Sequence, residues 1–168
     1  MEMPIKKNIK KIIVEININF SLLEAMYLSR EKTENVTVQQ KYAEFFIPFQ
    51  RSIIAIIIIQ IGYLFDKDDR SAASFYGLKS DSKNKALIEG WKKDNKLSET
   101  IKNLRDKTIA HFDHTQGVEG SIIIGELKEF ISKIDCLYKD IFEEKYIITH
   151  ETGSYKNAFD RIIGALKQ

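Results

Sequence analysis

The sequence predicts an all-α protein that forms a single domain over residues 1–168, an up-and-down bundle of four longer helices with one or two short helices. Apolar residues recur at intervals of three and four along most of the chain, the spacing that places them on one face of a helix. Eight glycines and two prolines leave few positions where the chain must turn. A chain of this length buries roughly 70% of its unfolded surface, which is enough for one hydrophobic core.

The first predicted helix shows the helical spacing most clearly and runs to about Lys32. After it, Asn35, Val36 and Thr37 indicate a turn that offers a cap to the next helix. The apolar stripe of the first helix consists of Ile5, Ile9, Ile12, Ile16, Phe20, Leu23 and Tyr27.

The segment from Phe45 to Phe65 contains the longest apolar run of the chain, Ile53 to Ile59. A membrane span needs about 20 apolar residues, and polar residues interrupt the wider segment, so we expect no membrane association. The segment is predicted to be a helix buried on most of its circumference, at the centre of a bundle or between two protomers. The interrupting residues are Gln50, Arg51, Ser52 and Gln60.

A buried strand over Ile53 to Ile61 is the alternative for this segment, because β-branched residues favour strands. The helix is preferred because the apolar pattern continues to Phe65 without a turn signal. Pro48 either kinks this helix or starts it anew.

The rest of the chain is also predicted to be helical. We expect a short helix over residues 71–78 and a longer helical region from about Asn84 to His111, with a break at Asp94-Asn95 and a cap at Ser98. Glycines at 117, 120 and 125 bracket a loop in which residues 122–124 could pack or pair as an extended segment. A fifth helix over residues 127–142 and a final short helix over residues 155–166 complete the bundle.

Composition limits the classes of function. The formal charge of +2 excludes a strongly basic nucleic-acid-binding protein, so any nucleic-acid site must be local. The single cysteine, Cys136, lies among apolar residues at helical spacing, and no export signal follows the first lysines, so we expect a cytoplasmic protein. Two basic clusters are most simply interpreted as solvated helix faces: Lys6, Lys7, Lys10 and Lys11, and Lys92, Lys93 and Lys96.

The stretch from Leu104 to Asp113 is the candidate functional site, because it places Arg105, Asp106 and His111 close together. Arginine is rare here, since 21 of the 26 basic residues are lysines, and its planar guanidinium suits phosphate binding. His111 continues an apolar stripe with intervals of four, three, four and three. The earlier members of that stripe are Leu97, Ile101, Leu104 and Thr108.

Helical geometry separates Arg105 from His111 by about 120° around the axis and about 9 Å along it. A single chain therefore brings the two side chains together only through the reach of the arginine. A symmetric dimer would instead gather two arginines and two histidines at one two-fold axis. Such a set could take the proton of an RNA 2′-hydroxyl, protonate the departing 5′-oxygen and stabilise the phosphorane charge without a metal.

These residues resemble the HEPN superfamily, in which an arginine, a polar residue and a histidine follow the pattern R-x4-6-H on a late helix. Here five residues separate Arg105 from His111, Asp106 occupies the polar position, and the form R-D-K-x-x-A-H-x-D is similar to the abortive-infection branch. The long apolar helix and Ser-rich short helix over residues 53–78 are also similar to that branch. The resemblance spans roughly residues 45–114.

The resemblance implies a homodimeric endoribonuclease that cleaves RNA without a metal or other cofactor, in phage defence or as a toxin, often beside a nucleotidyltransferase-like antitoxin. It implies that Arg105 binds or stabilises the scissile phosphate, that His111 is the acid or base, and that Asp106 orients one of them. Some HEPN-like domains bind partners without catalysis, so the rival interpretation is a helical dimerisation or partner-binding module.

Other interpretations of the same residues stay open. Arg105 could pair with Glu99 or Asp106, and His111 could be a hydrogen-bonded core residue. A metal site formed by His111, Asp113 and His114 would need more histidine or cysteine ligands than the chain offers nearby. Nucleophilic catalysis by Cys136 is disfavoured, because its surroundings are predicted to be core.

Overall fold

The computed structural model describes residues 2–66, 73–78, 81–95, 100, 101, 103, 124–144 and 152–167. These ranges are helical and contain no strand, which confirms the all-α bundle and excludes the buried strand considered for residues 53–61. The longer helices are α1 (Glu2–Ser29), α3 (Ala43–Leu64) and α6 (Ile124–Phe142). The shorter ones are α2 (Thr33–Lys41), the 3-10 helix η1 (Phe75–Leu78), α4 (Ser82–Asp94) and α7 (Thr152–Leu166).

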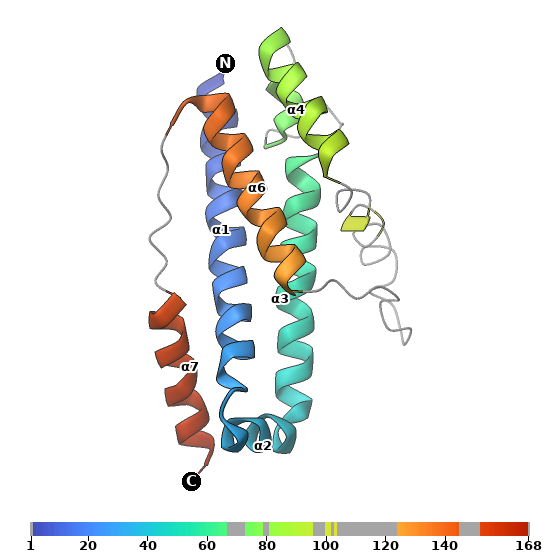
Figure 1. Cartoon of the computed structure of the whole chain (residues 1–168). Coiled ribbons are helices and arrows are strands. Elements are labelled where there is room, and N and C mark those ends of the chain that lie inside the picture. The colour runs from blue at the N-terminus through green and yellow to red at the C-terminus, as the bar shows by residue number, and fades with distance from the viewer. Residues whose placement is uncertain are drawn as a thin grey trace.

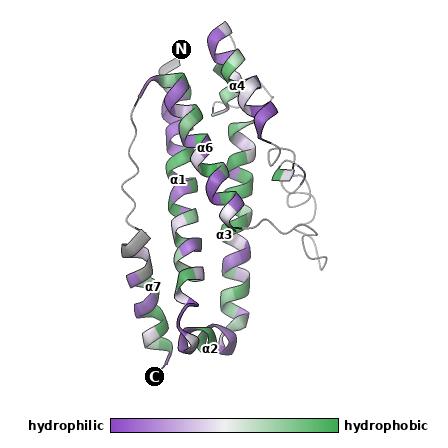
Figure 2. Ribbon diagram, in the orientation of Figure 1, coloured by the Kyte–Doolittle hydropathy of each residue, from purple (hydrophilic) through white to green (hydrophobic). Residues whose placement is uncertain are grey.

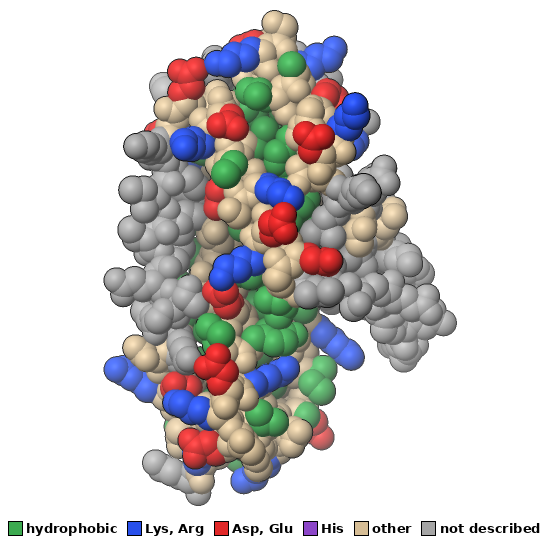
Figure 3. Space-filling model, in the orientation of Figure 1, with side chains coloured by type: hydrophobic (Ala, Val, Ile, Leu, Met, Phe, Trp, Pro, Cys, Tyr) green, Lys and Arg blue, Asp and Glu red, His purple; other side chains and the backbone are tan. Residues whose placement is uncertain are grey.

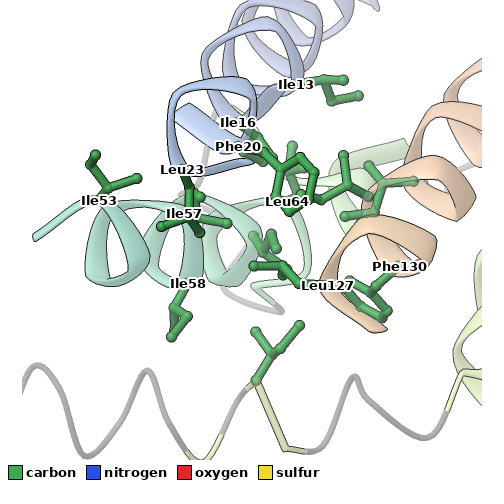
Figure 4. Close-up of a cluster of buried hydrophobic side chains, with 14 of the residues drawn as sticks. Ile13, Ile16, Phe20, Leu23, Ile53, Ile57, Ile58, Leu64, Leu127 and Phe130 are labelled. Carbon is green, nitrogen blue, oxygen red and sulfur yellow. The ribbon is translucent and has the colours of Figure 1, made fainter. Parts of the chain in front are cut away.

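Helix α1 lies at the centre of the arrangement and contacts α3, α6 and α7 (Figure 1). Helices α1 and α3 lie side by side and are joined at one end by α2, while α6 crosses them and α4 packs on α6 near the other end of α3 (Figure 1). The core therefore lies between α1 and its neighbours. Figure 4 shows side chains from three helices converging there: Ile13, Ile16, Phe20 and Leu23 of α1, Ile53, Ile57, Ile58 and Leu64 of α3, and Leu127 and Phe130 of α6.

The connection between α1 and α2 differs from the prediction. Helix α1 ends at Ser29, and the expected turn at residues 35–37 is wrong because these residues lie inside α2. The side chain of Asn35 instead serves the end of α1, since its Nδ2 donates to the carbonyl oxygen of Ser29 at 3.0 Å. An asparagine that satisfies a free helix carbonyl has the same sequence signature as one that forms a turn.

A polar corner fixes the ends of α1, α2 and α3 to one another. The Nε of Arg30 donates to Oε1 of Gln39 in α2 at 2.8 Å, and its Nη2 donates to Oε1 of Gln50 in α3 at 3.3 Å. The guanidinium also lies 4.9 Å from the ring centre of Tyr27. Because Arg30 binds two helices at once, the corner sets the angle at which α3 leaves α2.

Helix α3 begins at Ala43 and continues through Pro48, so Pro48 does not start a new helix. The prediction that this helix is buried on most of its circumference is wrong for the single chain. Ile53, Ile57 and Ile61 are buried against α1, but Phe45 is 58% exposed and Tyr63 is 50% exposed. Apolar residues recur along the whole of α3, on its inner and outer sides (Figure 2).

The later helices begin and end within a few residues of the predicted positions. Helix α4 ends at Asp94, which confirms the predicted break at residues 94–95, and α6 begins at Ile124 rather than at residue 127. Cys136 is exposed, so the expectation of core surroundings is wrong. It falls between Asp135 and Leu137 on the outer side of α6, off the stripe that packs on α1 and α4.

Helix α7 corresponds to the final helix predicted from the sequence. It packs against α1 and α2. Phe159 lies 5.8 Å from the ring of Phe46, and Ile163 is buried. Polar contacts join one edge of α7 to α2 and the residue before it, because Asp160 accepts hydrogen bonds from Lys32 at 3.2 Å and from Asn35 at 3.3 Å. The C-terminal helix is therefore attached by both an apolar face and a polar edge.

The residue that ends α6 has a backbone conformation unusual for its type. Glu143 has a φ of 52°, in the left-handed region that favours glycine. Its carboxylate pairs with the exposed Lys83 at 2.9 Å, which lowers the pKa of Glu143 through the hydrogen bond and the charge. An exposed pair of this kind adds little to stability, so the backbone conformation dominates the effect of substitution.

We predict that Glu143→Gly is more stable than Glu143→Ala by about 1 kcal/mol, because both lose the ion pair and only alanine keeps the left-handed strain. Thermal unfolding followed by circular dichroism measures the difference, which should be roughly 2–4 °C. Equal melting temperatures for the two variants would show that the chain relaxes at this position.

Candidate functional site

The three predicted catalytic residues, Arg105, Asp106 and His111, lie outside the described residues. The structure does describe the elements on either side of them. Ile101 is 2% exposed and belongs to the main apolar cluster, and Ile124, the first residue of α6, packs against the same cluster. The described residues that precede and follow the candidate segment are therefore packed on the core.

The burial of Ile101 can be compared with the prediction that the apolar stripe leading to His111 faces inward. Its burial agrees with the predicted inward direction of that stripe. The other members, Leu97, Leu104, Thr108 and His111, lie outside the described ranges, so the inward position of His111 stays a prediction.

An aromatic cluster holds the end of α4 close to α3 and α6, just before the candidate segment. The indole of Trp91 stacks on Phe65 with a centroid distance of 4.5 Å and lies 5.2 Å from the ring of Phe130. Its Nε1 donates to the carbonyl oxygen of Lys133 at 3.0 Å. Asn95 ends α4 by donating its Nδ2 to the carbonyl oxygen of Trp91 at 2.6 Å. These contacts fix the position from which the chain enters the segment.

The two predicted basic clusters have different surroundings. Lys6 and Lys10 pair with Glu144 at 3.3 and 3.8 Å, and Lys11 pairs with Glu15 at 3.9 Å, so two carboxylates offset part of the charge of this cluster. Lys92 and Lys93, in the last turn of α4, form no ion pair within the described ranges. Within the described ranges these two lysines are thus one cationic position without a carboxylate partner, next to Asp94.

Asp135 is an ionisable group that sequence reasoning missed. It lies on α6, partly buried, where Nδ2 of Asn17 in α1 donates to its Oδ1 at 3.2 Å. Burial raises the pKa of Asp135 to about 6, and the hydrogen bond from Asn17 opposes that rise. The sequence did contain a signal for it: Asp135 directly follows Ile134, which lies on the apolar stripe of the helix.

The metal hypothesis has no support from the described part of the chain, where no group of three His, Cys, Asp or Glu side chains is placed to hold an ion. The residues that the hypothesis named, His111, Asp113 and His114, lie outside those ranges, as does His150. Cys136 is a free, exposed cysteine.

Comparison with known proteins indicates a family. The model of a family described as AbiU2, of the HEPN type, matches residues 7–142. The match includes the segment from Leu104 to Asp113 and ends at the last residue of α6, so α7 lies beyond it. No curated protein and no solved structure matches the chain.

We predict that Asp135→Asn stabilises the protein above pH 6. The raised pKa means that the folded state binds a proton that the unfolded state has lost, so the contribution of Asp135 to stability falls as pH rises from about 4 to about 6 and stays low above that range. Asparagine removes this dependence and should add about 1–2 kcal/mol at neutral pH, a value reduced for the partial exposure of the group.

Urea unfolding at pH 4.5 and pH 7.5 measures this effect. The exposed Asp140 on the same helix gives the matched control, and Asp140→Asn should change stability little at either pH. The assignment fails if Asp135→Asn and Asp140→Asn show the same pH dependence.

Proposed function

Because this chain belongs to the AbiU2 family of HEPN proteins, we propose that it is a metal-independent endoribonuclease that acts in phage defence or as a toxin. The observation that carries the proposal is the family match across residues 7–142, which includes Arg105, Asp106 and His111 in the R-x4-6-H pattern. RNA is the substrate, and the chain's own side chains perform the reaction without a cofactor.

The reaction begins when a neutral His111 takes the proton from a ribose 2′-hydroxyl. The 2′-oxygen then forms a bond to the adjacent phosphorus, and the bond from phosphorus to the 5′-oxygen breaks. A protonated His111 gives its proton to the departing 5′-oxygen, so the products carry a 2′,3′-cyclic phosphate and a 5′-hydroxyl. The guanidinium of Arg105 stabilises the charge of the phosphorane, and Asp106 orients one of the two side chains.

One histidine cannot be both neutral and protonated in the same step. Two copies of His111, one from each protomer of a homodimer, supply both states when the pH is close to the histidine pKa of about 6.5. A two-fold axis near the segment would also bring two Arg105 side chains to one phosphate. The composite site therefore explains how a short motif with a single histidine performs both acid and base catalysis.

Two lysines at the end of α4, followed directly by Asp94, support an RNA substrate. Lys92 and Lys93 are available for phosphate contacts, and they precede the candidate segment by about ten residues. Basic side chains of this kind increase affinity for any RNA sequence without selecting a base. They would hold the strand while Arg105 binds the scissile phosphate.

The rival proposal is a non-catalytic helical module that dimerises or binds a partner such as a nucleotidyltransferase-like antitoxin. The open apolar side of α3 supports it, since exposed apolar surface of this extent marks interaction sites. This proposal requires that a variant without His111 binds the partner as the native protein does.

We predict that the protein cleaves RNA in the presence of EDTA and that His111→Ala lowers the rate at least 100-fold, because general acid and base catalysis contributes factors of about 10²–10⁴. Arg105→Ala should lower the rate by about 10²–10³ through loss of charge stabilisation. Gel analysis of a labelled RNA and identification of the cyclic phosphate measure the reaction.

His150→Ala and Arg161→Ala are the matched controls, since both residues lie outside the motif and beyond the family match. Both variants should cleave at the rate of the native sequence. The catalytic proposal is contradicted by cleavage that His111→Ala leaves unchanged, or by a lack of cleavage of any RNA.

We also predict that the double variant Lys92→Gln, Lys93→Gln binds RNA about 3- to 10-fold more weakly and loses roughly 1.4 from the slope of log affinity against log salt. Fluorescence anisotropy with the His111→Ala protein measures binding without cleavage. Lys6→Gln, Lys11→Gln is the matched control, because each of those lysines has a carboxylate within 4 Å. Equal losses in the two double variants would exclude a special role for the end of α4.

A further inference from the structure

Three hydrogen-bond donors from two helices converge on the carboxylate of Glu144, just beyond the end of α6. The hydroxyl of Tyr138 donates to its Oε2 at 3.0 Å, and the Nζ atoms of Lys6 and Lys10 lie 3.3 Å from Oε2 and 3.8 Å from Oε1. Helix α1 supplies both lysines and α6 supplies the tyrosine, at the end of the molecule where α1 begins and α6 ends (Figure 1). We call these four side chains the Glu144 cluster.

The Glu144 cluster is distinguished by a buried donor rather than by an excess of charge. Acidic and basic side chains both lie at this end of the molecule (Figure 3). Tyr138, in contrast, is 0% exposed, and burial raises the pKa of Tyr138, so its hydroxyl keeps its proton and donates. The ring of Phe142 lies 4.7 Å from that of Tyr138 and 5.3 Å from Nζ of Lys6. Donors beside such an apolar wall attract an anion more strongly than they would in open water.

An unusual backbone conformation brings the carboxylate to these donors. Glu143, the one residue between α6 and Glu144, has a φ of 52°, which is unfavourable for a residue with a Cβ. Glu144 thereby contacts Tyr138, six residues earlier in the chain. The hydrogen bonds from Tyr138 and then Lys6 lower the pKa of Glu144, so the carboxylate is charged. Its side chain is 40% exposed, so a solute can reach it. Glu144 is thus an anion that the chain itself supplies to three donors.

We propose that the three donors of the Glu144 cluster form a binding site for a small molecule that ends in a phosphate monoester, and that Glu144 occupies this site until such a ligand displaces it. A phosphate monoester brings three acceptor oxygens and close to two negative charges at neutral pH. A carboxylate brings two oxygens and one charge. The phosphate can therefore accept from all three donors at once.

The site goes beyond the proposed function and stands whether or not the chain cleaves RNA. The phosphates inside an RNA strand are diesters with one charge each, so they do not displace Glu144. The carboxylate is tethered to α6 by one residue and competes at an effective concentration on the order of millimolar or more. A phosphate monoester should therefore bind the native chain weakly, and replacing the carboxylate by an amide should strengthen binding.

Thermal unfolding of the full chain with methyl phosphate, at pH 7.5 and constant ionic strength, tests the proposal. A ligand that binds the folded state raises the melting temperature with its concentration, which gives a dissociation constant. We expect methyl phosphate to bind Glu144→Gln at least about 10-fold more tightly than the native chain, because the tethered competitor has lost its charge. In the Glu144→Gln background, Tyr138→Phe and Lys6→Gln should each weaken binding about 10-fold, the effect of one hydrogen bond to a charged group.

Glu143→Gln is the matched control, since Glu143 also follows α6 but pairs with Lys83. Dimethyl phosphate, a diester with one charge, is the control ligand. The proposal is overturned if Glu144→Gln binds methyl phosphate no more tightly than the native chain does, or if Glu143→Gln strengthens binding equally. Equal binding of dimethyl phosphate would overturn it too, since the cluster would then attract any anion. Undiminished binding in both Tyr138→Phe and Lys6→Gln would exclude the cluster as the site.

Discussion

The packing of α1 against three other helices is the constraint on which the rest of the structure depends. Its 28 residues present Ile9, Ile13 and Leu23, all fully buried, to partners that approach from different sides. A helix with neighbours on several sides needs apolar residues beyond a single stripe, and α1 meets this need while keeping Asn17 and Glu15 for polar contacts with α6 and α3. The positions of α3, α6 and α7 relative to one another therefore follow from their contacts with this one helix.

Much of this fold could be predicted because it depends on local periodicity. The helices α1, α3, α6 and α7 follow from apolar residues at intervals of three and four, and the break after Asp94 follows from two residues that favour helix ends. The errors arose where a side chain acts at a distance. Asn35 has the local signature of a turn, but its amide satisfies a carbonyl of the preceding helix, and only the folded arrangement brings the two groups together.

Exposure was harder to predict than secondary structure. Cys136 has apolar neighbours in sequence and lies outside, whereas Asp135 beside it is partly buried against Asn17. One residue step rotates a side chain by 100° on a helix, so the position of the partner helix decides which of two neighbours is covered. The candidate motif was visible because its residue types and spacing are themselves the signal, whereas the proposed arrangement of Arg105 and His111 across two chains depends on contacts that no single-chain pattern encodes.

The apolar character of both sides of α3 also matters before the chain has finished folding. By length and composition α1 and α3 could each cross a membrane, although 44% of the most apolar stretch of α1 and 33% of that of α3 are buried in the fold. Only α2 separates these two helices, so they form an antiparallel hairpin whose contacts are close in sequence and can form early during synthesis. Early pairing would shield the inner isoleucines of α3 while later helices are still being made. The short connection through α2 would thus shorten the time during which the inner side of the most apolar segment is open to other chains or to a lipid bilayer.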